Sequence, residues 1–174
     1  MKILVFTEKP FAPAAVKAIA NVVDAAGADL EVVEQGTRED LLKAVADVEG
    51  LIVRSDKIDG EVMAAAPKLK VIVRAGAGYD NIDLAAATER GICVMNTPGQ
   101  NSNAVAELVF GMLVFMARNR YNGKSGSELK GKTLGIYAFG QVGRNVARIA
   151  KGFGMNVTAL DVFVPDDKIE CEGV

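Results

Sequence analysis

Apolar and polar residues alternate along the first half of this chain in blocks that predict strands followed by helices. Short apolar runs rich in β-branched residues predict strands at 2–6, 30–33, 51–53, 69–73 and 92–95. Apolar residues at helical spacing, as at Val16 and Val23, predict helices at 11–26, 37–46 and 84–89. Thr37 is the expected N-cap of the second helix, and Gly91 ends the third. Such an alternation indicates an α/β fold with a parallel sheet covered on both faces.

The pattern changes near Pro98, where we place a boundary between two domains, 1–98 and 99–174. A long helix is predicted at 103–119, with no charged residue between Glu107 and Arg118. Its apolar run is about half as long as a membrane span requires. We therefore expect a buried helix, between two layers or at a dimer interface. The polar, glycine-rich segment 120–127 that follows reads as a loop.

The second domain contains a strand, a glycine turn and a helix, followed by another strand that ends at Asp161. This is the layout of a dinucleotide-binding βαβ unit, in which glycines let the backbone approach a pyrophosphate and the acid binds a ribose. Gly140 and Gly143 take the second and third glycine positions, but Ala138 stands at the first, and alanine tolerates a tight turn only if its φ stays negative. No arginine follows Asp161, which favours NAD over NADP. The alternative is a glycine turn that only packs a helix on a strand.

Polar residues follow several strands of the first domain. Arg54 and Ser55 end the third strand, Arg74 begins a glycine-rich stretch after the fourth, and Asn96 follows the fifth. The carboxyl ends of parallel strands share one edge of the sheet, so these residues would line one rim. Arginine side chains and backbone N–H groups there indicate a site for a small anion. The alternative is that the arginines are solvated or paired with acids such as Asp56 and Asp80.

Composition excludes several classes of partner and site. The net charge of −2 offers no basic excess for nucleic acid or an anionic membrane. Two cysteines, Cys93 and Cys171, make neither a disulfide scaffold nor a metal site, and we expect reduced thiols in a cytoplasm. The chain has no histidine, so a general acid or base must be a tuned carboxylate, lysine or cysteine, or lie outside this chain.

With these residues in view, the chain resembles the D-isomer-specific 2-hydroxyacid dehydrogenases over essentially all of its length. The blocks that carry the resemblance lie at 52–55, 66–70, 73–84, 94–99, 105–108 and 128–136. The family implies an enzyme with an NAD site in the cleft between two domains and hydride transfer between NAD and C2 of a D-2-hydroxy acid. The match is best to members that oxidise 3-phosphoglycerate to 3-phosphohydroxypyruvate, the first step of serine biosynthesis. The small-molecule partner would then be a phosphorylated hydroxy acid.

The resemblance also implies roles for domains and residues. It implies a flavodoxin-like substrate-binding domain at 1–98 and the first βαβ unit of a Rossmann NAD-binding domain at 99–174. Arg54 and Ser55 match residues that hold a phosphate or carboxylate, and Asn96 one near the substrate and hinge. The N–H groups that face the substrate carboxylate would come from Ala75, Gly76 and Gly78. The pyrophosphate turn would comprise Gly140, Gln141, Val142 and Gly143, and Asp161 would bind the adenosine ribose.

The family's catalytic residues lie later in its fold than residue 174, so no catalytic residue is expected here. We expect the N-terminal part of a longer, homodimeric enzyme, inactive by itself. The alternative is a naturally short, non-catalytic module that binds a nucleotide or an anion, or that dimerises. A receiver-like signalling domain is disfavoured because Arg54 and Thr7 stand where that class needs acids.

Overall fold

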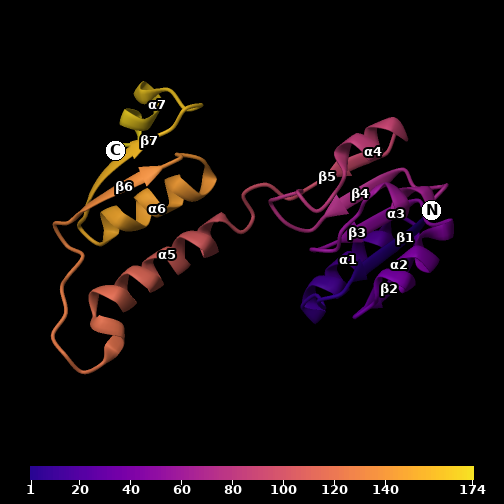
Figure 1. Ribbon diagram of the computed structural model, residues 1–174, viewed down its shortest axis with the longest axis horizontal. Helices are drawn as coiled ribbons and strands as arrows, with labels where there is room; N and C mark the ends of the chain where they lie inside the picture. Colours follow the sequence, from indigo (N-terminus) through magenta and orange to yellow (C-terminus); the bar gives the residue numbers. More distant parts are fainter. The chain divides into compact units, whose positions relative to one another are not determined.

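A computed structural model describes residues 1–174, and the chain divides into two units, Met1–Pro98 and Gly99–Val174 (Figure 1). The first unit is built on five parallel strands in the order β2-β1-β3-β4-β5. These strands are β1 (Lys2–Thr7), β2 (Asp29–Glu34), β3 (Gly50–Val53), β4 (Val71–Arg74) and β5 (Cys93–Met95). The predicted α/β fold with a parallel sheet is confirmed, and the strand order reverses its direction between β1 and β3.

One face of this sheet carries the core of the first unit. Strand residues Leu4, Leu51 and Ile72 are fully buried there. They pack beneath the short helices α2 (Arg38–Ala44), η1 (Val45–Asp47), α3 (Gly60–Ala64) and α4 (Leu84–Glu89). Helix α1 (Pro13–Ala25) lies against the opposite face, where Val23 is its one buried residue. That face is only partly covered within this chain, unlike the two covered faces that we predicted.

Local signals account for most of the helix ends in this unit. Thr37 caps α2 through a reciprocal pair, in which Asp40 N–H donates to Thr37 Oγ1 at 3.3 Å and Thr37 N–H donates to the Asp40 carboxylate at 2.9 Å. Gly91 follows α4 with a φ of +66°, a conformation that glycine adopts without strain. Helix α3 was not predicted; it is five residues long and is capped by the Asp59 carboxylate.

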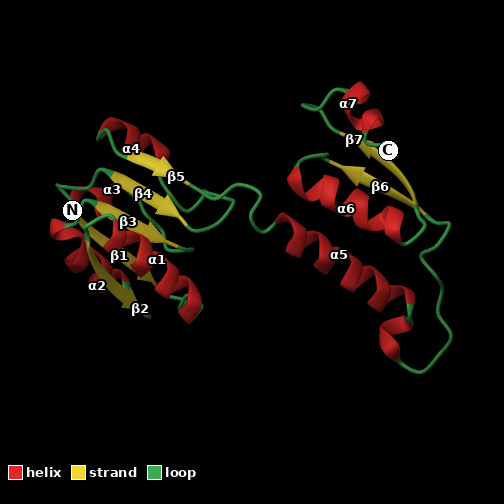
Figure 2. Cartoon of the chain, turned by 180° about the vertical axis from the view of Figure 1, so that it is seen from behind, coloured by secondary structure: helices red, strands yellow, loops and turns green.

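The second unit contains a pair of parallel strands, β6 (Thr133–Tyr137) and β7 (Asn156–Leu160) (Figure 2). Its helices are α5 (Ser102–Ala117), the turn η2 (Asn119–Tyr121), α6 (Gln141–Gly152) and α7 (Asp166–Cys171). The two long helices α5 and α6 pack together around Ala106, Phe110, Val146 and Ala150. Helix α7 was not predicted, and Cys171 is its last residue.

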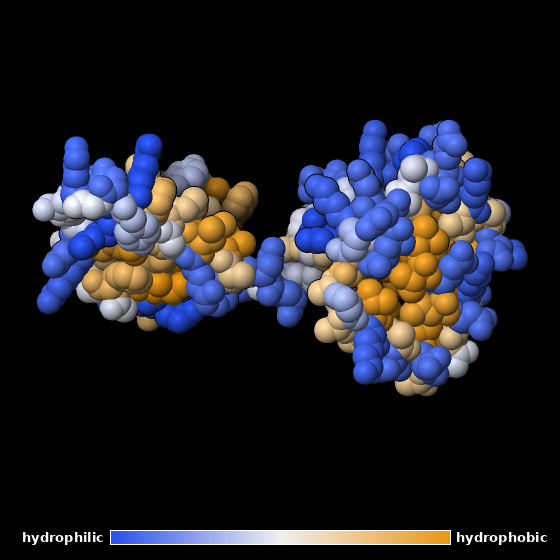
Figure 3. Space-filling view, turned by 90° about the horizontal axis from the view of Figure 1, so that it is seen from below, coloured by the Kyte–Doolittle hydropathy of each residue, from blue (hydrophilic) through white to orange (hydrophobic).

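Helix α5 is less buried within this chain than its apolar sequence predicted. Its buried residues are Ser102, Ala106 and Phe110. Its exposed apolar side chains are Val105, Leu108, Met112, Phe115 and Met116. Figure 3 shows apolar area on the side of the second unit where α5 lies. No helix of the structure, α5 included, combines the length and apolar character that a membrane crossing needs.

Candidate functional site

Two strand ends in the first unit place Arg54 beside the glycine-rich loop that follows β4. The register pairs Val53 of β3 with Arg74 of β4, so the segments that leave these strands start side by side. Arg74 Nε donates a hydrogen bond to the Arg54 carbonyl oxygen at 2.8 Å. A β-carbon on Gly76 would lie 1.7 Å from Arg74 Nη1, so the guanidinium occupies space that only a glycine leaves free. Arg74 therefore ties the two strand ends together, instead of extending over the rim as we predicted.

Arg54 carries the free guanidinium of this rim. Its side chain is exposed, and Nη1 donates to the Pro10 carbonyl at 3.2 Å. It forms an ion pair with neither Asp56 nor Asp80. The Asp56 carboxylate instead accepts backbone N–H groups from Glu8 at 2.7 Å and from Arg54 at 3.4 Å. A guanidinium without a carboxylate partner is suited to binding an anion, and the exposed Ser55 lies next to it in the chain.

The loop after β4 keeps part of its backbone available for a ligand. The N–H groups of Ala75 and Gly76 donate to Val53 and Arg74 carbonyls, both at 2.8 Å, so these two predicted donors are already in use. Gly78 N–H donates no hydrogen bond within the protein, and the same holds for Ala77 N–H. Of the three expected donors, Gly78 N–H is therefore the one still available to an anion, and Ala77 N–H is a further free donor beside it.

Residues that follow β5 hold this loop in place. Asn96 Nδ2 donates to the Ala77 carbonyl at 2.8 Å, and Thr97 N–H donates to the Gly76 carbonyl at 2.9 Å. Asn96 is partly buried and lies at the rim with the other predicted residues. With its amide nitrogen committed to the loop, its contribution is to fix the loop's position.

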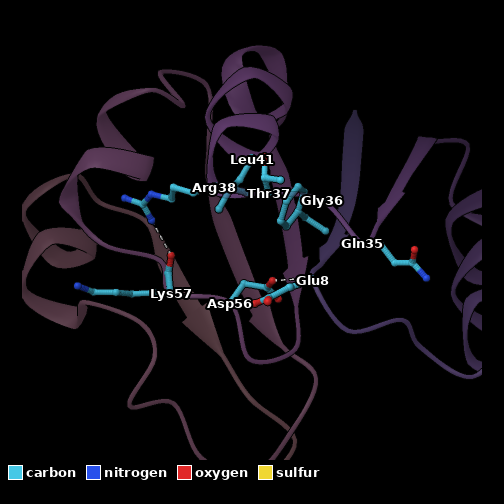
Figure 4. Close-up of a pocket in the computed structure, with 9 residues that line it drawn as sticks. Glu8, Gln35, Gly36, Thr37, Arg38, Leu41, Asp56 and Lys57 are labelled. Atoms are coloured by element: carbon cyan, nitrogen blue, oxygen red, sulfur yellow. Dashed lines mark hydrogen bonds between the residues drawn. The ribbon is translucent and has the colours of Figure 1, made fainter.

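A cavity of about 530 Å³ lies at the ends of β1, β2 and β3, where the strand order reverses. Such a place is where open parallel sheets bind ligands. Its lining residues, shown in Figure 4, are Phe6, Glu8, Gln35, Gly36, Thr37, Arg38, Leu41, Asp56 and Lys57. Sequence reasoning missed this cavity, although the Gln35-Gly36 pair directly after β2 is a turn signal at the correct edge of the sheet.

The cavity contains little free positive charge. The Arg38 guanidinium already donates hydrogen bonds to the Lys57 carbonyl at 2.9 Å, to Asp59 at 2.6 Å and to Glu61 at 2.7 Å. The Lys57 side chain extends away from Glu8 and Asp56 (Figure 4). The anion-binding groups of this edge are therefore concentrated at the Arg54 rim rather than in the cavity.

In the second unit, the turn between β6 and α6 has the shape of a phosphate-binding glycine turn. Ala138 has a φ of +86°, so the condition of a negative φ is not met, and an alanine stands in a conformation that favours glycine. A β-carbon on Gly143 would lie 2.3 Å from the Ala138 carbonyl oxygen, which explains the third glycine. Nothing lies within 4 Å of the β-carbon position of Gly140, the N-cap of α6. The turn thus presents open space at Gly140 and close packing at Gly143.

Gln141 and Val142 form the exposed first residues of α6. Helix α6 is twelve residues long. Its first N–H groups and the positive end of its dipole face the turn, which is the arrangement that binds phosphate groups. No group of histidine, cysteine and acidic side chains is placed to hold a metal ion.

Asp161 fastens the end of β7 to the glycine turn. One carboxylate oxygen accepts Phe139 N–H at 2.6 Å, and the other accepts Phe163 N–H at 2.7 Å and Val164 N–H at 3.1 Å. The hydrogen bonds from Phe163 and Phe139 hold the pKa of Asp161 below its ordinary value, so the group is ionised at neutral pH. A charged carboxylate at the end of the second strand is the group that a ribose diol requires.

Known proteins share this arrangement of sequence and structure. A family model described as "D-isomer specific 2-hydroxyacid dehydrogenase, catalytic domain" matches residues 3–161. D-3-phosphoglycerate dehydrogenase of Methanocaldococcus jannaschii is 42% identical over 160 residues, which cover 84% of this chain and 30% of the relative. The Homo sapiens enzyme of the same name is 44% identical over 161 residues, 83% of this chain and 30% of the relative.

A solved structure adds a match in three dimensions. The NAD+-bound 3-phosphoglycerate dehydrogenase of Entamoeba histolytica superimposes with a TM-score of 0.89 at 51% identity, covering 95% of this chain and 55% of that one. The chain thus spans about half of this structure and less than a third of the curated relatives. Because the family model covers most of the 174 residues, the chain belongs to the family of D-isomer-specific 2-hydroxyacid dehydrogenases.

Proposed function

We propose that the protein containing this chain is an NAD-dependent dehydrogenase that oxidises 3-phosphoglycerate to 3-phosphohydroxypyruvate, the first step of serine biosynthesis. The observation that carries this proposal is the turn at 138–143 with Asp161 bonded to it, in a chain 51% identical to an NAD+-bound 3-phosphoglycerate dehydrogenase. In this proposal the first unit, 1–98, binds substrate, and the second, 99–174, begins an NAD-binding domain. We place the enzyme in the cytoplasm.

The residues of the turn fit NAD. Gly140 leaves room for the pyrophosphate to approach, and Gly143 lets the start of α6 pack against the Ala138 carbonyl. The N–H groups of Gln141 and Val142 would bind pyrophosphate oxygens, and Asp161 would accept hydrogen bonds from the adenosine ribose. An anionic Asp161 would repel a 2′-phosphate, which supports NAD over NADP. When bound, NAD supplies the hydride acceptor.

The rim of the first unit fits the acidic groups of the substrate. Arg54 would bind the phosphate or the carboxylate by paired N–H donors, and Ser55 would add a hydroxyl. The free N–H of Gly78 would bind the second anionic group. Arg74, Ala75, Gly76 and Asn96 would fix this surface in position rather than bind the substrate through the groups predicted for them.

The reaction also needs a group that takes the proton from the C2 hydroxyl as the hydride leaves. This chain has no histidine, and the Asp56 carboxylate at the rim already accepts the backbone N–H groups of Glu8 and Arg54. We propose that the catalytic residues belong to parts of the protein beyond these residues, so that this segment alone is inactive. The relatives from Methanocaldococcus jannaschii and Homo sapiens, of which 70% lies outside the aligned region, are long enough to supply them.

We also propose that the protein is a homodimer joined through α5. Five large apolar side chains of that helix are exposed, from Val105 to Met116, on a helix whose opposite side is packed on α6. A continuous apolar surface of this kind is characteristic of an interface. A naturally short, non-catalytic module that dimerises through this same surface is the second candidate function.

Intact mass of the natural gene product, followed by a dehydrogenase assay with 3-phosphoglycerate and NAD, tests the proposal. We expect a mass well above 18.3 kDa and NADH formation. Arg54→Met should lower kcat/KM by at least about tenfold, because it removes a bidentate contact to an anion. Arg90→Met, an arginine at the end of α4, is the matched control and should have little effect. A natural mass near 18.3 kDa without turnover would establish the short module instead.

A further inference from the structure

Phe139 links the glycine turn to the core of the second unit. It stands between Ala138 and Gly140, and its ring is completely buried. The ring packs in a cluster with Ala147 and Ile169. Its backbone N–H makes the 2.6 Å bond to Asp161. Because ring and N–H belong to one residue, a shift of the ring moves the donor that orients the Asp161 carboxylate.

Arg144 contacts both the Phe139 ring and Glu172. It lies in the first turn of α6, and its guanidinium carbon is 5.4 Å from the centre of the Phe139 ring, within the range of a cation–π contact. On its other side, Arg144 Nε donates to Glu172 Oε1 at 2.6 Å. Glu172 follows α7, whose Ile169 packs in the same cluster as Phe139. The guanidinium is therefore held between a carboxylate and a ring of the turn.

We propose that Arg144 is a positioning residue of the dinucleotide site. It fixes Phe139, and through the N–H of Phe139 it orients Asp161, while Glu172 keeps the guanidinium on the ring. This inference rests on the proposed NAD site. It differs from a direct contact of Arg144 with the pyrophosphate, in which Glu172 would compete with the ligand for the same guanidinium.

The two roles predict opposite effects of Glu172→Gln. If Arg144 acts through the ring, losing the carboxylate frees the guanidinium from Phe139, and the affinity for NADH falls. If Arg144 binds pyrophosphate directly, the same substitution frees the Arg144 guanidinium to bind the ligand, and the affinity for NADH is unchanged or rises. Glu172 pairs at a partly exposed surface, so this variant is expected to fold.

NADH titrations followed by the fluorescence of the nucleotide itself test this inference. We expect Arg144→Met to weaken binding by roughly three- to tenfold, the range of a cation–π contact with an ion pair. Glu172→Gln should weaken it by about threefold, and Arg144→Lys should restore part of the loss. Lys151→Met is the control, because Lys151 contacts the main-chain oxygen of Glu172 and not Arg144. Wild-type affinity in Arg144→Met, or unchanged or tighter binding in Glu172→Gln, would overturn the inference.

A second readout needs no nucleotide. A carbon-13 NMR titration of the Asp161 carboxyl follows this coupling, because the Phe139 N–H bond and the charge of Arg144 both lower the pKa of Asp161. Displacement of Arg144 with loss of the Phe139 N–H bond would raise that pKa. We expect a raised pKa in Glu172→Gln, and a lowered or unchanged value would refute the role of Arg144. A raised pKa of Asp161 in Glu172→Gln, together with a wild-type protein that binds no NADH, would refute the proposed cofactor but not the coupling between these residues.

Discussion

The carbonyl oxygen of Ala138 lies so close to Gly143 that a β-carbon on residue 143 would be 2.3 Å away from it. Real β-carbons do not approach oxygen atoms that closely, so the backbone would have to move. The start of α6 and the strand that leads into the turn are therefore packed against each other without room for a side chain. This contact makes the geometry of the turn dependent on one residue.

Gly143→Ala should destabilise the protein by about 2 kcal/mol and abolish detectable NADH binding, because the turn must open to accept the methyl group. Gly152→Ala is the matched control at the other end of α6, where nothing lies within 4 Å of the new β-carbon. It should leave stability unchanged or raise it by about 0.5 kcal/mol. Urea unfolding and NADH titration of both variants check this, and equal behaviour of the two would contradict it.

Ala138→Gly should make the protein more stable by about 1 kcal/mol, because a φ of +86° strains alanine and not glycine. The same substitution at the exposed Ala18 in α1 should instead cost about 1 kcal/mol, the usual penalty of glycine in a helix. Urea unfolding of the two variants measures the contrast. A loss of stability at both positions would show that Ala138 is not strained.

Gly76→Ala should disturb the substrate rim without affecting the dinucleotide turn. The new methyl group would overlap the Arg74 guanidinium, which must leave the Arg54 carbonyl. We expect KM for the hydroxy acid to rise by about tenfold, with an unchanged dissociation constant for NADH. Gly60→Ala, whose β-carbon would meet its nearest neighbour at an ordinary 3.7 Å, is the control. An unchanged KM in both variants would argue against a rim at Arg54.

Arg38→Met should remove a stabilising contribution that depends on pH. The hydrogen bond from Arg38 lowers the pKa of Asp59 in the folded protein. A depressed carboxyl pKa stabilises the fold above the unfolded value of about 3.9, and this contribution is lost as the pH falls through the folded pKa. The free energy of unfolding of the wild type should therefore exceed that of Arg38→Met by roughly 1 kcal/mol at pH 7, and this difference should shrink below about pH 4.

Urea unfolding at pH values from 3 to 8 measures this difference. Lys17→Met in α1 is the control, because Lys17 makes none of the ion pairs of the structure. Its effect on stability should not vary with pH. A constant difference between the wild type and Arg38→Met down to pH 3 would show that the Arg38–Asp59 pair contributes nothing.

Met112→Lys should separate the proposed dimer, because it places a charge in the centre of the exposed apolar surface of α5. Light scattering should give a mass of twice 18.3 kDa for the chain with the unchanged sequence. It should give a mass of about 18.3 kDa for the variant. Val22→Lys places the same charge on an exposed apolar residue of α1 and should leave the mass unchanged. A wild-type monomer would rule out α5 as an interface.

The regular part of this fold was predictable from the sequence because its strands are continuous apolar runs. The positions of β1 to β7 follow those runs, and the Thr37 cap and the Gly91 helix end follow from single residues. Helix α3 was missed because five residues are too few for a periodic pattern. Helix α7 was missed for the same reason, since it has six residues and one buried side chain.

The candidate site was predictable in its residues but not in the directions of their side chains. Nothing in the sequence indicates that Arg74 turns back onto Gly76, because that depends on the pairing of β3 with β4. The φ of Ala138 is set where its N–H meets the Leu160 carbonyl, a contact 22 residues away in the chain. The cavity at Gly36 joins three strand ends, and the turn signal at Gln35-Gly36 marks only one of them.

The hydrogen bonds of Asn96 and Thr97 have a mechanical consequence. Both residues are fastened to the carbonyls of the loop after β4, and the second unit begins at Gly99. Any pivot in the chain that connects the first unit to the second therefore starts after Thr97, where Pro98 is followed by Gly99 with a φ of +77°. The proposed substrate loop is therefore fastened to the chain on the first unit's side of any such pivot.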